Sequence, residues 1–489
     1  MFSWTVLTAL LALFGGEALE LDTIARNFLS NGNNQTFNGL QFIRDKLNSF
    51  RSLEKDLLTY ENPKRMSDNT QGDESEIPVD HIDKETPEMS EINKQLKQYL
   101  YQGDIALTAG QLSELVSRSK RQAYKDSHFP QTRWQKGNEG AIAYFFDWSI
   151  DYRVKGLIRE ALRYWEERTC LQFEEDGPQR PILRFFKGTG CWSYVGKMSF
   201  WKEQDISIGK GCDHFGVIVH EIGHALGFFH AQSRHDRDQY VSFIPENVEL
   251  GSVGQFNKES TSTNENYGMP YDYGSVMHYS EEAFATDEQR PALVAREKLH
   301  QHTMGSRVAP SFVDVLLMNT HYQCLDECKN SQTKCANGGY PSPKNCNKCI
   351  CPWGFGGRLC TMRALGTIGT SDLECGQTVL ASDEWKPLNG KVGNEREEAR
   401  DRHDSCHWHI KASSGHKVEI SVLFVGPVCS GGCFFGNVEF KMKRDFRNTG
   451  YRMCCAQHKR DELILTSETE LAVTDSRMSK EENKEPVNP

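Results

Sequence analysis

The cysteines are the feature that most limits how this chain can fold. The 489-residue sequence has 16 cysteines, all between Cys170 and Cys455, and they crowd together after Cys324. Such crowding is typical of small modules that disulfides stabilise in an oxidising compartment. The alternative explanation of the crowded cysteines is that they bind zinc in a cytosolic zinc ribbon. Because the chain is also too long for one compact core, we expect several domains.

The N-terminal residues favour secretion. The stretch MFSWTVLTALLALFGGEALE contains an apolar run that ends in small residues near Ala18 and is too short to span a bilayer. We interpret residues 1–18 as a signal peptide, with a buried strand or helix as the alternative. No later apolar run is long enough for a transmembrane helix. A secreted, extracellular protein is therefore expected, and its net charge of −10 gives no reason to expect nucleic acid.

Residues 19–121 are predicted to be a propeptide. They contain no cysteine, show helical patterning at 25–30, 42–60 and 92–104, and include an acidic linker. The segment ends in SRSKRQ, which resembles a proprotein-convertase site with cleavage after Arg121; a solvated basic turn is the alternative. Asn34 begins a glycosylation sequon within the propeptide.

Residues 122–325 are expected to form an α+β domain. The stretches at 140–150 and 181–188 have the pattern of strands, whereas those at 154–169 and 213–227 have the pattern of helices. In the second helix, Asp213 is the predicted N-cap and Gly227 the predicted C-terminal stop.

The second of these helices carries a candidate metal site. His220 and His224 are four residues apart, so a helix directs both imidazoles from one face toward a common point. A tetrahedral catalytic zinc needs a third protein ligand and an open position for water. Gly227 can end the helix at positive φ and let the chain return His230 to the metal, and Glu221 then lies beside the open position. A solvated or structural His-rich helix is the alternative.

A second stretch, YDYGSVMHYS, resembles the Met-turn of metzincin proteases, with Met277 in the turn and Tyr279 after it. Together with HEIGHALGFFHAQSRHDRD, it resembles the astacin family of zinc metalloendopeptidases, in which the tyrosine lies next to the zinc. The EGF-like and CUB-like stretches described below make the chain most similar to the nematode branch. An adamalysin is a weaker alternative, which the cysteine placement and the propeptide disfavour. Matrix metalloproteinases use a propeptide cysteine that is absent here.

The astacin resemblance has several further implications. It implies disulfides Cys170–Cys324 and Cys191–Cys212. The stretch YQGD resembles the family's Phe-x-Gly-Asp motif, which implies that Asp104 takes the open position of the zinc and keeps the zymogen latent. At Ala231 the family has a glutamate that receives the charged mature N-terminus, so that ion pair cannot form here through residue 231.

Two further modules are expected. Residues 326–361 resemble an EGF-like module, which implies the pairs Cys328–Cys346, Cys335–Cys349 and Cys351–Cys360. Residues 375–473 have the alternation of a β-sandwich and resemble a CUB domain, with Cys375 and Cys406 as characteristic cysteines. An extra disulfide is expected among Cys429, Cys433, Cys454 and Cys455. Residues 474–489 are expected to be a disordered tail.

These observations predict a proteolytic mechanism. One zinc ion on the three histidines lowers the pKa of bound water, Glu221 acts as general base and then returns the proton to the leaving amine, and Tyr279 supplements the stabilisation of the oxyanion. The resemblance implies substrates among extracellular matrix, cuticle or eggshell proteins or secreted precursors. The alternative from another class is a matrix-binding protein with an inactive protease fold, which the retention of the full site disfavours.

Overall fold

The computed structural model describes residues 88–108, 111, 131–137, 139–259, 261, 264–287, 289–368, 371–373, 375–390, 392, 403–425, 429–454 and 463–478. The expected signal peptide, the sequon at Asn34 and the processing site at Arg121 lie outside these residues. Within the described part, no helix has the length and hydropathy needed to cross a membrane.

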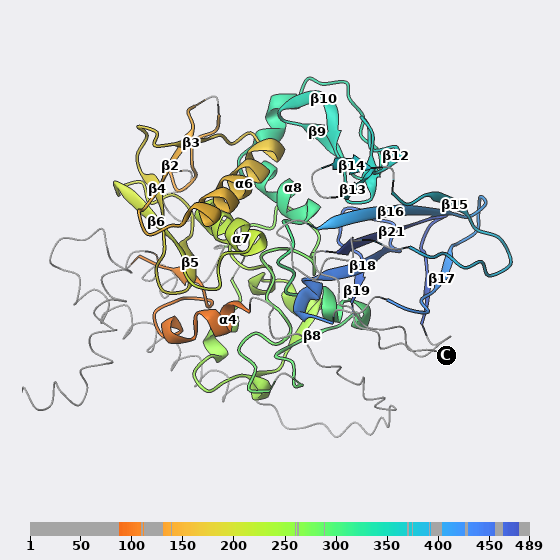
Figure 1. The fold of residues 1–489 in the computed structure, drawn as a ribbon, viewed down its shortest axis with the longest axis horizontal. Helices are drawn as coiled ribbons and strands as arrows, with labels where there is room; N and C mark the ends of the chain where they lie inside the picture. Colours follow the sequence, from red (N-terminus) through yellow and green to blue (C-terminus); the bar gives the residue numbers. More distant parts are fainter. Residues whose placement is uncertain are drawn as a thin grey trace, which may run out of the picture.

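A six-stranded sheet forms one side of the first domain (Figure 1). Its order is β1-β5-β6-β4-β2-β3, and its pairs are parallel except β5 with β6. The strands are β1 (Ile105–Ala106), β2 (Ile142–Phe146), β3 (Phe173–Glu175), β4 (Ile182–Phe186), β5 (Cys191–Tyr194) and β6 (Glu203–Ile208). The edge strand β1 comes from the predicted propeptide.

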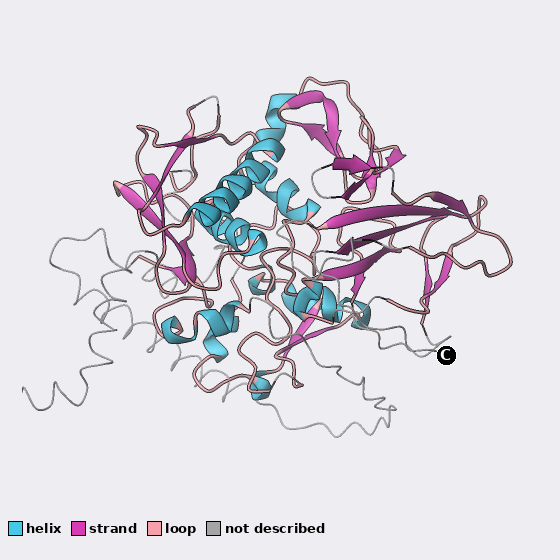
Figure 2. Ribbon diagram, viewed as in Figure 1, coloured by secondary structure: helices cyan, strands magenta, loops and turns pink. Residues whose placement is uncertain are grey.

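Two helices, α6 (Tyr152–Arg168) and α7 (Phe215–Ala225), lie against this sheet and beside each other (Figure 2). Asp151 caps α6, because its side chain accepts a hydrogen bond from the Val154 amide at 3.0 Å. The buried face of α6 carries large apolar side chains, including Trp165, which is completely buried. Helix and strand in one layered unit confirm the predicted α+β class of the first domain.

The predicted N-cap of α7 is wrong. The cap residue is His214, which makes no side-chain cap, and Asp213 lies one residue too early. The Asp213 carboxylate instead forms an ion pair with Arg153 at the start of α6. At the other end, Gly227 has φ +108°, as predicted for the residue that stops the helix.

The rest of the first domain is made of short elements around α8 (Phe312–His321), with β7 (Val241–Phe243) paired antiparallel to β8 (Leu293–Ala295). Its 3-10 helices are η2 (Ala231–Ser233), η3 (Arg237–Gln239), η4 (Pro245–Asn247), η5 (Val253–Phe256), η6 (Lys298–Thr303) and η7 (Cys324–Cys328). The disulfides Cys170–Cys324 and Cys191–Cys212 are both present, as the resemblance implied.

The described part of the predicted propeptide does not form one helix over 92–104, although its pattern predicted one. It contains α4 (Met89–Ile92) and η1 (Lys94–Leu96), after which the chain turns into β1. The reason is a tertiary contact at the first turn. Asn93 donates to the Gly103 and Cys191 carbonyls at 3.0 and 2.6 Å and accepts from the Cys191 amide at 2.8 Å. These bonds fold the segment back against β5.

The cysteine-rich stretch after Cys324 contains two small hairpins. Strand β9 (Tyr340–Ser342) pairs with β10 (Asn345–Ile350), and β11 (Phe355–Gly356) pairs with β12 (Met362–Arg363). The structure contains the three implied disulfides, which are Cys328–Cys346, Cys335–Cys349 and Cys351–Cys360. These bonds hold together a unit that is too small for a large apolar core.

The C-terminal unit consists of a seven-stranded sheet and a separate two-stranded one. The larger sheet contains β13 (Gly366–Ile368), β14 (Ser371–Leu373), β15 (Thr378–Leu380), β16 (Asp404–Lys411), β18 (Gly436–Lys441), β19 (Tyr451–Met453) and β21 (Leu471–Met478). The smaller sheet pairs β17 (Glu419–Ser421) with β20 (Ile464–Thr466), and η8 (Gly431–Cys433) precedes β18.

The predicted boundaries of this unit need correction, because the sheet begins at Gly366 and β21 runs to Met478. The polar residues after 473 are therefore not all a disordered tail. Asp475 and Arg477 are buried and form an ion pair of 2.7 Å, so polar composition misled the prediction. Residues 479–489 lie outside the described part.

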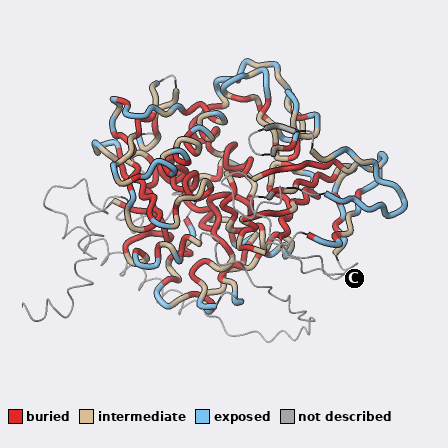
Figure 3. The backbone as a smooth tube through the Cα atoms, viewed as in Figure 1, coloured by how far each residue is buried: buried red, intermediate tan, exposed pale blue. Residues whose placement is uncertain are grey.

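The cysteines of this unit are largely paired. Cys375 bonds to Cys406 and Cys433 bonds to Cys454, while Cys429 is also disulfide-bonded. Cys455 lies outside the described residues. The buried residues run through α6, α7 and the loops beside them and continue into β16 and β21 (Figure 3).

Candidate metal centre and active site

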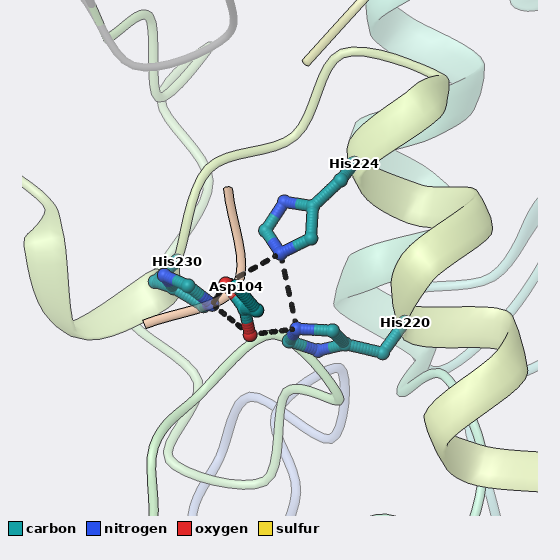
Figure 4. Close-up of side chains that lie close together, drawn as sticks. All are labelled: Asp104, His220, His224 and His230. Carbon is teal, nitrogen blue, oxygen red and sulfur yellow. Dashed lines mark hydrogen bonds and ion pairs between the residues drawn. The ribbon is translucent and has the colours of Figure 1, made fainter. Parts of the chain in front are cut away.

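Four side chains from three parts of the chain converge beside α7: Asp104, His220, His224 and His230 (Figure 4). All four are buried, and their potential ligand atoms lie within 4.8 Å of one another. His220 and His224 project from one face of α7, and the turn at Gly227 brings His230 back to them. The structure thus brings together the three histidines that the sequence singled out, together with the aspartate of the YQGD stretch.

The spacing of the four groups fits one zinc ion. The Nε2 atoms of His220 and His224 are 3.1 Å apart. Asp104 oxygens lie 3.1 Å from His220 Nε2, 3.3 Å from His224 Nε2 and 3.1 Å from His230 Nε2. Zinc–nitrogen bonds of about 2.0–2.1 Å place two ligands of a tetrahedral ion about 3.3 Å apart.

The hydrogen bonds of the three rings also require a cation. Each Nδ1 atom faces an oxygen acceptor: Val276 O for His220 at 2.8 Å, Phe228 O for His224 at 2.6 Å and Gln102 Oε1 for His230 at 3.1 Å.

Each Nδ1 therefore carries the proton, and each Nε2 directs a lone pair at the carboxylate of Asp104. Without a positive ion between them these lone pairs would repel, so the residues fit a metal.

The electrostatics agree with neutral ligands. Burial lowers the pKa of His220 to about 3 and that of His230 to about 4. Neutral imidazoles and an ionised carboxylate are the forms in which these side chains bind zinc.

Glu221 lies next to His220 on α7 and is completely buried. Neither of its carboxylate oxygens has a hydrogen-bond partner in the described part of the protein. Burial and the negative charge of Asp104 raise its pKa well above the ordinary value. An unsatisfied buried carboxylate is costly, and such groups concentrate where a proton is taken up or given away.

Tyr279 lies beside His230 at the edge of the four-residue cluster. Its ring centroid is 4.6 Å from that of His230, and its hydroxyl donates a hydrogen bond to the Gln102 backbone carbonyl. Met277, two residues earlier, is buried, and a Cβ placed on Gly223 of α7 would lie 2.9 Å from its Sδ atom. The Met-turn thus packs directly beneath the metal-binding helix.

Residues distant in sequence hold this turn in place, and the motif analysis missed them. Asp314, in the first turn of α8, accepts hydrogen bonds from Ser275 Oγ at 2.6 Å and from the Val276 amide at 2.8 Å. The buried Arg307 donates to the Val276 and His278 carbonyls at 2.9 and 2.8 Å.

One of these residues, Asp314, belongs to a motif that can be recognised in the sequence. The spacing of Ser311 and Asp314 is that of a capping box, which signals the start of a helix but not a contact with the Met-turn.

The chain resembles known metalloproteases over much of its length. A family model described as "Astacin (Peptidase family M12A)" matches residues 126–323. The high choriolytic enzyme 1 of Oryzias latipes, a hatching enzyme zinc-protease, is 30% identical, and the match covers 41% of this chain and 98% of that one with a TM-score of 0.38.

Two relatives from Caenorhabditis elegans match over more of the chain. Zinc metalloproteinase nas-31 is 37% identical over 463 residues, covering 89% of this chain and 73% of the relative. Zinc metalloproteinase nas-27 is 37% identical over 365 residues, covering 74% and 82%. The chain therefore belongs to the astacin family, peptidase family M12A, and is a zinc metalloendopeptidase that uses one zinc ion.

Proposed function

We propose that this protein is a secreted protease made as a latent zymogen, in which Asp104 blocks the zinc site until the chain is cut after Arg121. The observation that carries the proposal is the position of the Asp104 carboxylate among the three Nε2 atoms. A carboxylate at this point takes the position that a catalytic zinc needs for water.

The backbone of the propeptide supports the same interpretation. Strand β1 pairs in parallel with the edge strand β5, with Ile105 opposite Ser193, and the Ser193 amide donates to the Asp104 carbonyl at 3.1 Å. An extended substrate would need this sheet edge for its own backbone hydrogen bonds. The propeptide therefore competes with substrate for the sheet edge and for the metal.

In the activated enzyme, His220, His224 and His230 hold the zinc, which when bound supplies Lewis-acid polarisation and lowers the pKa of water. Glu221 accepts a proton from the attacking water and later delivers it to the leaving amine. Departure of the propeptide frees the Tyr279 hydroxyl from the Gln102 carbonyl, so that it can donate to the oxyanion of the cleaved peptide bond.

The organisation proposed for the whole chain is a signal peptide at 1–18, a propeptide at 19–121 and a protease domain at 122–325. An EGF-like module at 326–361 and a CUB domain follow, the latter revised to about 366–478 by the strands of the sheet. We further propose glycosylation at Asn34, activation by a proprotein convertase, and substrates among extracellular matrix, cuticle or eggshell proteins or secreted precursors.

The test uses the full chain made uncleavable by Arg121→Ala, with and without Asp104→Asn. The proposal predicts little hydrolysis of a quenched peptide library by the uncleavable chain, and hydrolysis restored at least tenfold by Asp104→Asn. Equal and full activity of both proteins would show that Asp104 does not enforce latency.

A further inference from the structure

The C-terminal unit contacts the segment that carries the Met-turn. Strand β19 packs against η6 of the first domain, and the turn between β18 and β19 contains Asn448 and Thr449. Thr449 donates to the Asp272 carboxylate through its amide at 3.1 Å and through its hydroxyl at 3.2 Å. Asn448 Nδ2 donates to the Tyr271 carbonyl at 3.4 Å. Each of these three bonds joins residues that are 177 positions apart in the chain.

The contact is close and largely shielded from water. Asp272 is 4% exposed and Thr449 is 5% exposed. A Cβ placed on Gly274 would lie 2.4 Å from Thr449 Cγ2, so the two chain segments approach more closely there than any other residue type would allow. The Asp272 carboxylate also accepts a hydrogen bond from the Gly274 amide at 3.1 Å. One buried carboxylate thus joins Thr449 to the residues that lead into the Met-turn.

Hydrogen bonds connect the same segment to Tyr279. The Asp272 carbonyl accepts from the Ser275 amide at 3.2 Å, and the Ser275 carbonyl accepts from the His278 amide at 3.0 Å. The ring of His278 donates through Nδ1 to the Tyr279 carbonyl at 2.7 Å and accepts through Nε2 from the Tyr271 hydroxyl at 2.7 Å. Tyr271 and Asp272, which the C-terminal unit contacts, are therefore connected to Tyr279 by short chains of hydrogen bonds.

We infer that Thr449 is a positioning residue for catalysis, because by holding Asp272 it fixes the Met-turn segment in the conformation that directs the Tyr279 hydroxyl at the oxyanion. This inference rests on the proposed role of Tyr279. A donor must lie about 2.7–3.1 Å from the oxyanion, and a displacement of about 1 Å can cost about 100-fold in rate. The C-terminal unit contributes none of the four clustered side chains, yet the reaction depends on it through this contact.

The experiment is a double-mutant cycle on the full chain cleaved after Arg121, with wild type, Thr449→Val, Tyr279→Phe and the double variant. Valine keeps the shape of threonine and places a methyl group where the hydroxyl donates to Asp272. Thr449→Val is expected to lower kcat for a quenched peptide at least fivefold, with KM within twofold of wild type. In the Tyr279→Phe background the same substitution should change kcat less than twofold, because no hydroxyl remains to be positioned.

Two further variants separate the hydroxyl from other effects of the substitution. Thr449→Ser keeps the hydroxyl and should restore kcat to within twofold of wild type. Thr466→Val makes the same chemical change at an exposed position of β20 and should leave both constants unchanged.

An equal fall of kcat in both backgrounds would overturn the inference, because a merely structural role of Thr449 acts whether or not residue 279 carries a hydroxyl. An unchanged kcat in Thr449→Val would overturn it as well. In both of these cases a low kcat of Tyr279→Phe alone leaves the proposed mechanism standing. If Tyr279→Phe alone has the kcat of wild type, the proposed role of Tyr279 fails and the inference fails with it.

Discussion

Gln102 Oε1 accepts a hydrogen bond from His230 Nδ1 at 3.1 Å, so a residue of the proposed propeptide orients one of the three clustered histidines. The backbone carbonyl of the same residue accepts a hydrogen bond from the Tyr279 hydroxyl. One propeptide residue thus controls the surroundings of a metal-binding histidine and of the candidate oxyanion donor. The proposed release of the propeptide would change both at once.

Removal of the Gln102 side chain should weaken latency. In the uncleavable chain, Gln102→Ala is expected to raise residual hydrolysis at least fivefold, because the side chain bonds to both His230 and Glu259 and a single neutral hydrogen bond already contributes about 1 kcal/mol. The measurement is turnover of a quenched peptide relative to the cleaved enzyme. Gln95→Ala is the control, since Gln95 is exposed on η1, and it should have no effect. If Gln102→Ala causes no rise in residual hydrolysis, the side-chain amide of Gln102 contributes nothing to latency.

A methyl group at Gly103 should displace the propeptide. Gly103 has φ +81°, and a Cβ there would lie 3.0 Å from Phe284 Cζ and 3.1 Å from the Tyr279 hydroxyl oxygen. Gly103→Ala in the uncleavable chain is expected to raise residual hydrolysis at least tenfold, because the substitution adds backbone strain and crowds the site.

Gly251 supplies the control for backbone strain. It also has φ +81°, but a Cβ there would meet nothing within 4 Å. Gly251→Ala should therefore leave latency unchanged. A similar gain of activity from both substitutions would mean that general destabilisation, and not the contact with Tyr279, releases the propeptide.

Tyr279→Phe should lower kcat more than it raises KM. The hydroxyl is proposed to act on the oxyanion, and loss of one such donor typically costs about 100-fold or more in kcat. Steady-state kinetics of the cleaved enzyme separate the two constants. Tyr152→Phe, at an 89% exposed position far from the site in sequence, is the control. A rise in KM with kcat unchanged would assign Tyr279 to binding alone.

The contribution of Asp314, which holds the Met-turn, to the free energy of unfolding should depend on pH. Burial raises the pKa of Asp314 to about 6, although hydrogen bonds from Ser275 and from backbone amides oppose the shift. An acid whose pKa is raised by folding contributes most stability below its unfolded pKa of about 3.9 and loses that contribution as the pH rises through 6. The free energy of unfolding of wild type minus that of Asp314→Asn should therefore fall by up to about 3 kcal/mol between pH 4 and pH 7.

Chemical denaturation at a series of pH values measures this difference, in which the titration of other groups common to both proteins cancels. A difference that rises with pH would mean that the three hydrogen bonds to the charged carboxylate outweigh burial, and that Asp314 is ionised throughout.

The local motifs could be predicted from the sequence because each depends on a short, regular spacing. Helix periodicity sets the positions of His220 and His224, and a glycine with positive φ returns His230 to them. The disulfides of the first domain and of the cysteine-rich module also match the pairs implied by resemblance.

The supporting contacts could not be predicted, because they join residues far apart in the chain. Gln102 is 128 residues from His230, and Asp314 is 38 residues from Val276. Neither residue type signals such a role without the fold. The helix predicted over 92–104 failed for the same reason, since the bonds between Asn93 and Cys191 override the local pattern.

The most direct test of the account measures zinc content and hydrolysis together, on the chain cleaved after Arg121 and on the same protein with Glu221→Ala. We expect one zinc ion per chain in both proteins, because Glu221 is not among the clustered ligands, and turnover only in the first. Zinc in both with equal turnover would contradict the role of Glu221 as general base. Absence of zinc from active enzyme would contradict the metal centre itself.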